Sequence, residues 1–483
     1  MRYAPRLRVA WAAVLFALLG RAWPPARSAE REVFVAPAGT PAGKGTKESP
    51  LDLKSAFGYG HLLKPGTTVW VAGGRYEIGQ LRQGREVQGT KDQPIVFRAV
   101  PGERATIAGG FSVTQSHTWL WGLEIAGPNE CGVGVAGGDG VKLINLVIHD
   151  AGPAEPPKER KPSGQGIGPG DVGNDHEYYG NLVYQNGWNG LDHGIYPQNT
   201  ARHTPKRIVD NVFFENAGFG IHAYGEAPTL CGFHVEGNIC FATAKKPRAA
   251  QEGGVNILLG GQKPISNIVL KDNCTYHPDA GSKRGVDIGF HGHGNSNILV
   301  EHNYFMCGSN AIELKNVLDA VVRDNTFWAP SGMISVTYGP GADKSKVIFE
   351  GNTYIDNKRF DLAQWRATTG SAKTDKVVRG KDGRPTGLLV FKRVNQYEPE
   401  RVHLAVYNWD RRPVVRIALK DILQAGDSYR VVSVLDYFGK PVAQGKAPGA
   451  CVDLPMKGRR YEPEFGAYIL FRPRPSVPPA PQP

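Results

Sequence analysis

Short segments in which apolar and polar residues alternate recur between about residues 140 and 357. Each segment ends in an Asn that two or three apolar or aromatic residues follow. Eight such Asn residues occur, at spacings of 36, 30, 27, 35, 30, 22 and 27: Asn145, Asn181, Asn211, Asn238, Asn273, Asn303, Asn325 and Asn352. This pattern predicts a β-solenoid with one turn per repeat, in which a constant core carries loops of variable length.

The recurring Asn has a structural explanation. Asn adopts a left-handed backbone more readily than most residues, and its side-chain amide can hydrogen-bond to copies in the turns above and below. We therefore expect an internal ladder of amides and not eight active-site residues.

A second strand precedes most of these Asn residues. It should point one apolar residue of each turn into the solenoid, namely Ile195, Ile221, Val255, Val286, Ile312 and Ile334. Strand side chains alternate between faces, so the next residues form an outward column: Tyr196, His222, Asn256, Asp287, Glu313 and Ser335. A parallel column follows two residues later: Gln198, Tyr224, Leu258, Gly289, Lys315 and Thr337. Together the two columns predict one polar and aromatic stripe along the outside of the solenoid.

The region before the repeats carries a family resemblance. It reads VFVAPAGTPAGKGTKESPLDLKSAF, then LLKPGTTVWVAGGRYEI, then DQPIVFRAVPGERATIAGG. This resembles the entry of the pectate-lyase-like superfamily, and its style is similar to the chondroitinase B and alginate lyase group. The resemblance, over about residues 33–357, implies an all-β fold, a right-handed parallel β-helix built as a single-stranded solenoid. It does not fix the chemistry, because such folds host lyases, hydrolases, epimerases and binding proteins.

The pattern divides the chain into five parts. Residues 1–29 resemble a signal peptide, with Arg2, Arg6 and Arg8 before a short apolar run. The β-helix is expected over residues 30–368 and a linker over 369–384. Alternating segments at 385–474 predict a small antiparallel β-sandwich, in which Trp409 packs in the core. The Pro-rich residues 475–483 are expected to be disordered.

The net charge and the cysteine content indicate what the protein binds and where it acts. The formal net charge is +12, and residues 1–29 hold five Arg and no acid, which leaves 12 − 5 = +7 for the rest. Mild basicity suits an acidic glycan, although it also suits an ordinary soluble surface. No Lys/Arg block of the nucleic-acid-binding kind and no later membrane span is evident. The six Cys residues are better explained as buried free thiols than as disulfides. We expect a secreted or periplasmic monomer with a polysaccharide substrate.

One chemistry open to the stripe is that of a lyase or epimerase on a uronic-acid polymer. A cation or amide must stabilise the sugar carboxylate, and a base must remove the neighbouring proton. An acid must protonate the leaving oxygen in a lyase, or return the proton to the sugar in an epimerase. His222 is the candidate base, and Tyr196 or Tyr224 the candidate acid. His193 is a second candidate base, whose tautomer Asp192 could fix. The candidate substrate-binding residues are Asn256, Lys315, Gln198 and Asp192.

Two alternatives stay open. Asp287 and Glu313 on neighbouring turns could act as the carboxylate pair of a glycoside hydrolase, or they could bind a Ca²⁺ ion or pair with Lys315. The stripe could also belong to a non-catalytic binding or adhesion solenoid. No cofactor and no zinc site are predicted, since His291 and His293 in the HGHG segment have no evident third ligand.

Overall fold

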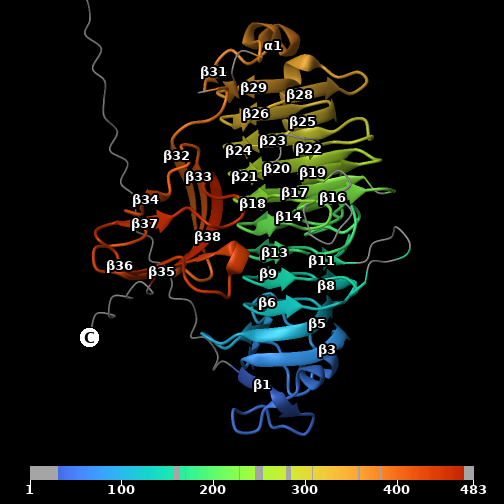
Figure 1. The fold of residues 1–483 in the computed structure, drawn as a ribbon. Coiled ribbons are helices and arrows are strands. Elements are labelled where there is room, and N and C mark those ends of the chain that lie inside the picture. Colours follow the sequence, from blue (N-terminus) through green and yellow to red (C-terminus); the bar gives the residue numbers. More distant parts are fainter. Residues whose placement is uncertain are drawn as a thin grey trace, which may run out of the picture.

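Three parallel sheets wind around one long apolar core between residues 31 and 379 (Figure 1). The computed structural model describes residues 31–472 except 156–157, 159–163, 169, 228, 245–253, 279–283, 307, 357–358 and 381. The predicted signal peptide and Pro-rich tail lie outside the described residues, as does Cys307. The stacked parallel strands confirm the predicted β-helix, and an antiparallel unit follows it.

Each sheet collects strands from successive turns, and the second sheet takes two strands from each of two turns, β7 with β8 and β10 with β11. The first sheet consists of β1 (Arg31–Thr40), β2 (Thr67–Val71), β4 (Ile95–Ala99), β6 (Thr118–Trp121), β9 (Lys142–Ile144), β12 (Glu177–Tyr179), β14 (Lys206–Val209), β17 (Leu230–Glu236), β20 (Ile265–Lys271), β23 (Ser296–Glu301), β26 (Ala320–Arg323) and β29 (Val347–Glu350). The second consists of β3 (Gly74–Arg82), β5 (Ala105–Val113), β7 (Glu124–Ala126), β8 (Cys131–Val135), β10 (Val147–His149), β11 (Gln165–Gly168), β13 (Leu182–Tyr184), β15 (Val212–Phe214), β18 (Ile239–Phe241), β21 (Cys274–Tyr276), β24 (Tyr304–Met306), β27 (Thr326–Trp328), β30 (Thr353–Asp356) and β31 (Lys376–Arg379). The third consists of β16 (Ile221–Gly225), β19 (Val255–Gly261), β22 (Arg284–Ile288), β25 (Asn310–Val317) and β28 (Gly332–Tyr338).

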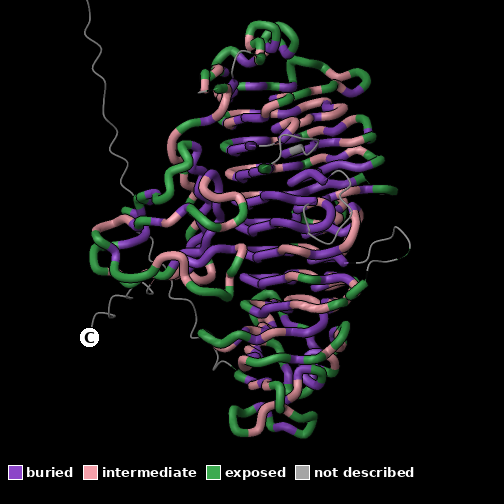
Figure 2. Tube along the Cα trace, in the orientation of Figure 1, coloured by how far each residue is buried: buried purple, intermediate pink, exposed green. Residues whose placement is uncertain are grey.

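The register of the first sheet explains the core. Apolar residues pair from turn to turn and point inward in one buried column: Val69, Phe97, Leu120, Leu143, Tyr178, Ile208, Val235, Leu270, Val300, Val322 and Phe349. Figure 2 shows this buried interior along the length of the solenoid. Side-chain alternation in strands therefore gives each turn one apolar face toward the axis.

The predicted Asn ladder is present, with one correction. Buried amides hydrogen-bond from turn to turn at Asn181, Asn211, Asn238, Asn273, Asn303, Asn325 and Asn352, and the carboxylate of Asp375 ends the ladder. Asn145 is not a member, because Leu146 occupies the ladder position of that turn. The side-chain oxygen of Asn181 accepts a hydrogen bond from the backbone N–H of Leu146. Asn145 precedes that position with φ 52°, and its Oδ1 accepts from Asn395 of the C-terminal unit at 2.7 Å.

The left-handed residue of each turn is also different from the prediction. It is the residue before the ladder position, as at Asp210 (φ 55°) and Asp272 (φ 54°). The ladder Asn itself is favoured by its hydrogen bonds alone. A second, shorter ladder joins Asn186 and Asn216, whose side chains bond at 3.0 Å.

The antiparallel unit is a small sandwich, as predicted. A five-stranded sheet holds β32 (Leu388–Val394), β33 (Arg401–Asn408), β35 (Ser428–Ser433), β36 (Ala443–Lys446) and β38 (Phe465–Phe471), and a two-stranded sheet holds β34 (Val414–Ala418) and β37 (Cys451–Pro455). Their facing apolar side chains form one core. The other face of the larger sheet packs on the second sheet of the β-helix, where the indole N–H of Trp409 donates to Tyr304 at 2.9 Å (Figure 1).

An arginine ties the two units together. Arg393 on β32 contacts carboxylates from successive turns of the β-helix, with Asp210 at 2.6 Å, Glu236 at 2.9 Å and Asp272 at 3.4 Å. These contacts and the shared apolar cluster hold the sandwich against one side of the solenoid.

The boundary between the units differs from the expected one. Helix α1 (Leu362–Thr369) closes the end of the solenoid, and β31 then pairs in parallel with β30, so the β-helix runs into the predicted linker at 369–384. Short helical turns occupy Lys54–Gly58, Lys344–Lys346 and Val434–Asp436. Cys131, Cys231, Cys274 and Cys451 are free thiols. Among the described residues, no helix is long and apolar enough to cross a membrane.

Candidate functional site

The third sheet carries the predicted stripe on its outer face, with a changed register. Ile195 pairs with Ile221, and Ile221 pairs with Ile257, so the outward column reads Tyr196, His222, Leu258, Asp287, Glu313 and Ser335. The second column has Gly260 where Leu258 was expected. Most predicted stripe residues therefore share one face.

Asn256 is the residue that the prediction misplaced. It lies two residues upstream of the column position, is fully buried, and accepts a hydrogen bond from the hydroxyl of Thr243 at 3.0 Å. Val255, Ile257 and Leu259 all satisfy the same alternation, so the apolar pattern alone could not choose between registers that differ by two residues. Asn256 therefore cannot bind substrate on this face.

Aromatic rings gather around His222 at one end of the stripe. The imidazole stacks on Phe219 with centroids 4.2 Å apart, and lies 5.3 Å from Tyr196 and 5.1 Å from Tyr224. Burial raises the pKa of Tyr196 to about 12, so its hydroxyl stays protonated. We call Tyr196, Phe219, His222 and Tyr224 the aromatic cluster.

The tautomer of His222 is determined by its hydrogen bond with His193. The backbone N–H of Phe219 donates to Nδ1 of His193, which leaves the proton of this neutral ring on Nε2. That nitrogen lies 2.7 Å from Nδ1 of His222 and donates to it. His222 then carries its own proton on Nε2, so it faces the stripe as an N–H donor and not as the base that the sequence suggested.

His193 and Asp192 have structural positions. Burial lowers the pKa of His193 to about 3, and the ring is 2 % exposed behind His222. Asp192 does not fix that ring. Its buried carboxylate accepts from the backbone N–H groups of Gly164, Trp188 and Asn189, which organises the loop before the stripe. Neither side chain can reach a substrate directly.

The burial of His193 should make the folded protein less stable in acid. His193 is neutral in the folded protein down to about pH 3, whereas in the unfolded chain it protonates near pH 6.5. Its contribution to stability is therefore present above pH 6.5 and is lost as the pH falls. Between pH 7 and pH 5 we expect His193 to account for about 2 kcal/mol of lost unfolding free energy.

Urea unfolding at both pH values checks this expectation. His193→Gln should reduce the pH-dependent loss by that amount, and His61→Gln at an exposed position should not. An unchanged pH dependence in His193→Gln would contradict the assigned neutral state.

A lysine lies between two carboxylates at the other end of the stripe. The Nζ of Lys315 is 2.9 Å from Oε2 of Glu313 and 3.6 Å from Oδ2 of Asp287. The side chain of Asp287 has no exposed surface, that of Glu313 is 14 % exposed, and that of Lys315 is 25 % exposed. Asn310 donates to Glu313 from the side. We call Asp287, Glu313 and Lys315 the lysine–carboxylate cluster.

The two clusters are neighbours but do not form one reaction centre. His222 and Glu313 lie three strands apart in one column, which corresponds to roughly 14 Å at the usual strand spacing. Phe290 lies between the clusters, with its ring 5.7 Å from that of Tyr224 and 5.5 Å from the Nζ of Lys315. An extended chain of several sugars is therefore needed to touch both clusters.

Two glutamines support the aromatic end. Gln198 donates to the backbone carbonyl of Tyr224 at 3.1 Å, and Gln262 donates to its hydroxyl at 3.0 Å. These bonds fix the position of Tyr224. The sequence pattern missed Gln262, Phe219 and Phe290, because they lie outside the two columns.

No convergent metal site appears among the described residues, where no group of three or more His, Cys, Asp and Glu side chains comes together. The ammonium of Lys315 lies between Asp287 and Glu313, the two carboxylates that could otherwise share a Ca²⁺ ion. His291 and His293 are both exposed.

Three similar solved structures share between 11% and 16% identity with this chain. No protein-family model matches the chain, and no curated protein matches it. Similar solved structures include pectate lyase Pel9A, at 16% identity and a TM-score of 0.42, covering 72% of this chain and 78% of that one. They also include XylC in complex with xylose, at 11% identity and a TM-score of 0.43, covering 91% and 99%. A mannuronic-acid-specific family 6 polysaccharide lyase from human gut microbiota has 14% identity and a TM-score of 0.35, covering 73% and 92%.

Proposed function

We propose that this protein is an enzyme that acts on an acidic polysaccharide by removing the proton next to a sugar carboxylate, as a lyase or an epimerase does. The observation that carries the proposal is the partly exposed ammonium of Lys315 beside the partly exposed carboxylate of Glu313, on a face that continues into aromatic rings. A cation and a base at contact distance are what this proton transfer requires.

Lys315 is the group that would receive the sugar carboxylate. Neutralising that carboxylate stabilises the negative charge that develops when the neighbouring proton leaves. Asp287 is buried behind Lys315 and holds its ammonium without touching the substrate. Glu313 would accept the proton, since its carboxylate is oriented by Lys315 and Asn310. In the lyase reaction the electron pair of the C5–H bond would form the C4–C5 double bond as the C4–O bond breaks, and Glu313 would return its proton to the departing oxygen. In the epimerase reaction C5 would instead receive a proton from solvent on the opposite face of the ring.

The aromatic cluster and the neighbouring Phe290 would bind the sugars on one side of the reacting unit. Sugar rings present C–H faces that pack on aromatic rings, and here Tyr224 and Phe290 offer such faces. Hydroxyl groups of the sugar can accept from the N–H of His222 and the O–H of Tyr196. In this proposal the two tyrosines and His222 bind substrate and do not carry out the proton abstraction.

The burial of Asp287 speaks against the hydrolase alternative. A carboxylate pair that cleaves a glycosidic bond must have both members in reach of the sugar. Asp287 has no exposed surface, and Lys315 lies against both carboxylates.

Incubation with polygalacturonate and with alginate tests the proposal. Elimination creates a conjugated double bond that absorbs ultraviolet light, and epimerisation changes the sugar signals in the NMR spectrum of the polymer. Either result on one of the acidic polymers is expected. New reducing ends without a double bond would instead indicate a hydrolase, and binding without any chemical change would indicate a binding solenoid.

A further inference from the structure

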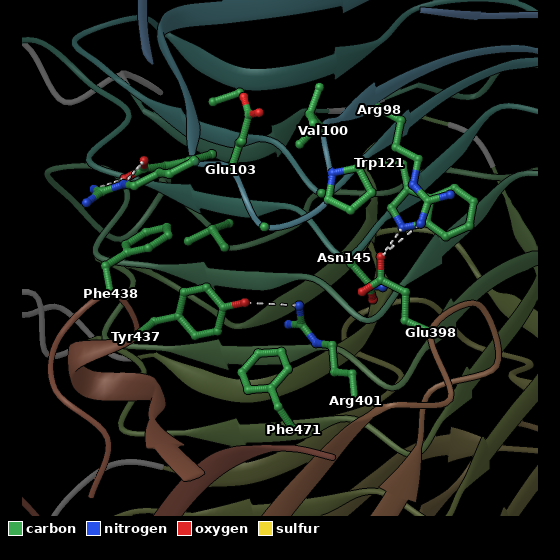
Figure 3. Close-up of a pocket in the computed structure, with 18 of the residues that line it drawn as sticks. Arg98, Val100, Glu103, Trp121, Asn145, Glu398, Arg401, Tyr437, Phe438 and Phe471 are labelled. Atoms are coloured by element: carbon green, nitrogen blue, oxygen red, sulfur yellow. Dashed lines mark hydrogen bonds and ion pairs between the residues drawn. The ribbon is translucent and has the colours of Figure 1, made fainter. Parts of the chain in front are cut away.

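A cavity of about 420 Å³ lies between the β-helix and the C-terminal sandwich, on another side of the molecule from the stripe. Its walls come from the turns after β4 and β6 and from the sandwich (Figure 3). Figure 3 shows Arg401 and Tyr437 facing Asn145 and Trp121 across this space. The stripe uses none of these residues.

Arg401 is an unusual group in this cavity. It is 3 % exposed, and within the described chain no carboxylate forms an ion pair with it. Three of its five N–H donors have acceptors, at Nε2 of His403, the hydroxyl of Tyr437 and the carbonyl of Gly180. One N–H on each terminal nitrogen has no acceptor among the described residues. A buried charge without a counter-charge is costly, and a guanidinium fork matches the geometry of a carboxylate.

Arg104 and Glu398, which also line the cavity, are paired with other groups. Arg104 is bonded to Glu124 at 2.6 Å and lies over the ring of Phe438. Glu398 accepts from the indole of Trp121 at 2.7 Å and lies 3.6 Å from Arg98.

The apolar part of the lining is aromatic. Tyr437, Phe438 and Phe471 face the cavity from the sandwich, and Trp121 faces it from the β-helix. Arg430 is exposed at the rim, with its guanidinium 4.6 Å from the ring centroid of Phe471. A ligand that combines a carboxylate with an apolar ring face fits these walls.

A row of side chains leads out of the cavity along the first sheet. The register places Trp121, Arg98, Trp70 and Phe34 in one outward column on β6, β4, β2 and β1, and all four are half-buried. The guanidinium of Arg98 lies 3.8 Å from the ring of Trp121 and 5.7 Å from that of Trp70. The two indoles are two strands apart, or roughly 10 Å, which is close to the length of two sugar units in an extended chain.

We propose that this cavity and the row beside it form a second binding site for an acidic saccharide, which binds one sugar carboxylate at Arg401 and carries the adjoining sugars along Trp121, Arg98 and Trp70. The site goes beyond the proposed enzymatic function, because it lies on other sheets and contains no reacting groups. It would hold the polymer while the third sheet acts on it.

Calorimetric titration with trigalacturonate tests this site in a Tyr224→Ala background, which the proposed function expects to weaken binding at the stripe. Arg430→Ala and Trp121→Ala should each weaken the remaining binding about tenfold, and Arg401→Gln should weaken it further. Arg416→Ala is the matched control, since Arg416 is an exposed arginine of the sandwich that is paired with Asp453 away from the cavity. It should leave the affinity unchanged.

Neutral cellotriose and monomeric galacturonate complete the test. Cellotriose should bind at least tenfold more weakly than trigalacturonate, and so should the monomer. Equal binding of cellotriose would overturn the role of Arg401, and equal binding of the monomer would reduce the site to one for a small carboxylate. Unchanged affinity in a folded Trp121→Ala protein would overturn the proposal even if Arg401→Gln fails to fold. None of these outcomes depends on catalysis at Lys315.

Discussion

Replacing Lys315 with Ala should lower kcat/KM on the acidic polymer by about 100- to 1000-fold, because the substrate carboxylate loses the cation that stabilises the transition state. The loss should fall mainly on kcat, since that charge develops only as the proton leaves. Initial rates of ultraviolet absorbance over a range of polymer concentrations measure both parameters. Tyr224→Ala should differ by raising KM more than it lowers kcat, because its ring binds a neighbouring sugar in this proposal.

Two further variants serve as controls for Lys315→Ala. Lys315→Arg keeps a cation beside the buried Asp287 and should recover part of the activity. Lys271→Ala removes a lysine that pairs with Glu301 at 3.2 Å on the first sheet, and it should leave kcat/KM unchanged. Full activity in a folded Lys315→Ala protein would remove Lys315 from the reaction.

Replacing Asn273 with Ala should lower the free energy of unfolding by about 3–5 kcal/mol. Its amide donates to the carbonyls of Val235 and Lys271 and to Asn303, and its Oδ1 accepts from Asn238. The substitution leaves several buried backbone and amide groups without partners, each at about 1–3 kcal/mol. Urea unfolding followed by circular dichroism measures the change.

Gln424→Ala is the control for this substitution, since Gln424 is exposed on the sandwich and should change stability by less than about 0.5 kcal/mol. If Asn273→Ala were as stable as the control, the ladder would not be a source of stability. The repeat of Asn along the sequence would then need another explanation.

Much of the fold could be predicted from short sequence patterns that recur in each turn. A β-helix repeats the same packing problem at each turn, so residues such as Asn211 and Ile221 recur with recognisable neighbours. The sequence pattern assigns Asn145 to the ladder because Asn145 follows the same apolar-polar segment, but in the structure it occupies the left-handed position one residue before the ladder. The sequence pattern ends the solenoid too early, because β31 is short and the ladder ends there in Asp375 and not in Asn.

The site was harder to predict because it depends on register. A two-residue shift keeps every apolar side chain inside, so alternation placed His222, Asp287 and Glu313 on the correct face but put Asn256 in place of Leu258. The tautomer of His222 depends on the backbone N–H of Phe219, which no sequence pattern reports. The cavity around Arg401 joins residues about 300 positions apart along the chain.

A crystal structure of the protein with a bound acidic oligosaccharide tests the central claim most directly. The proposed function predicts a sugar chain across the third sheet, with one ring against Tyr224 or Phe290 and one carboxylate within hydrogen-bonding distance of the Nζ of Lys315. An oligosaccharide seated elsewhere, with the face of β16, β19, β22 and β25 left bare, would contradict it.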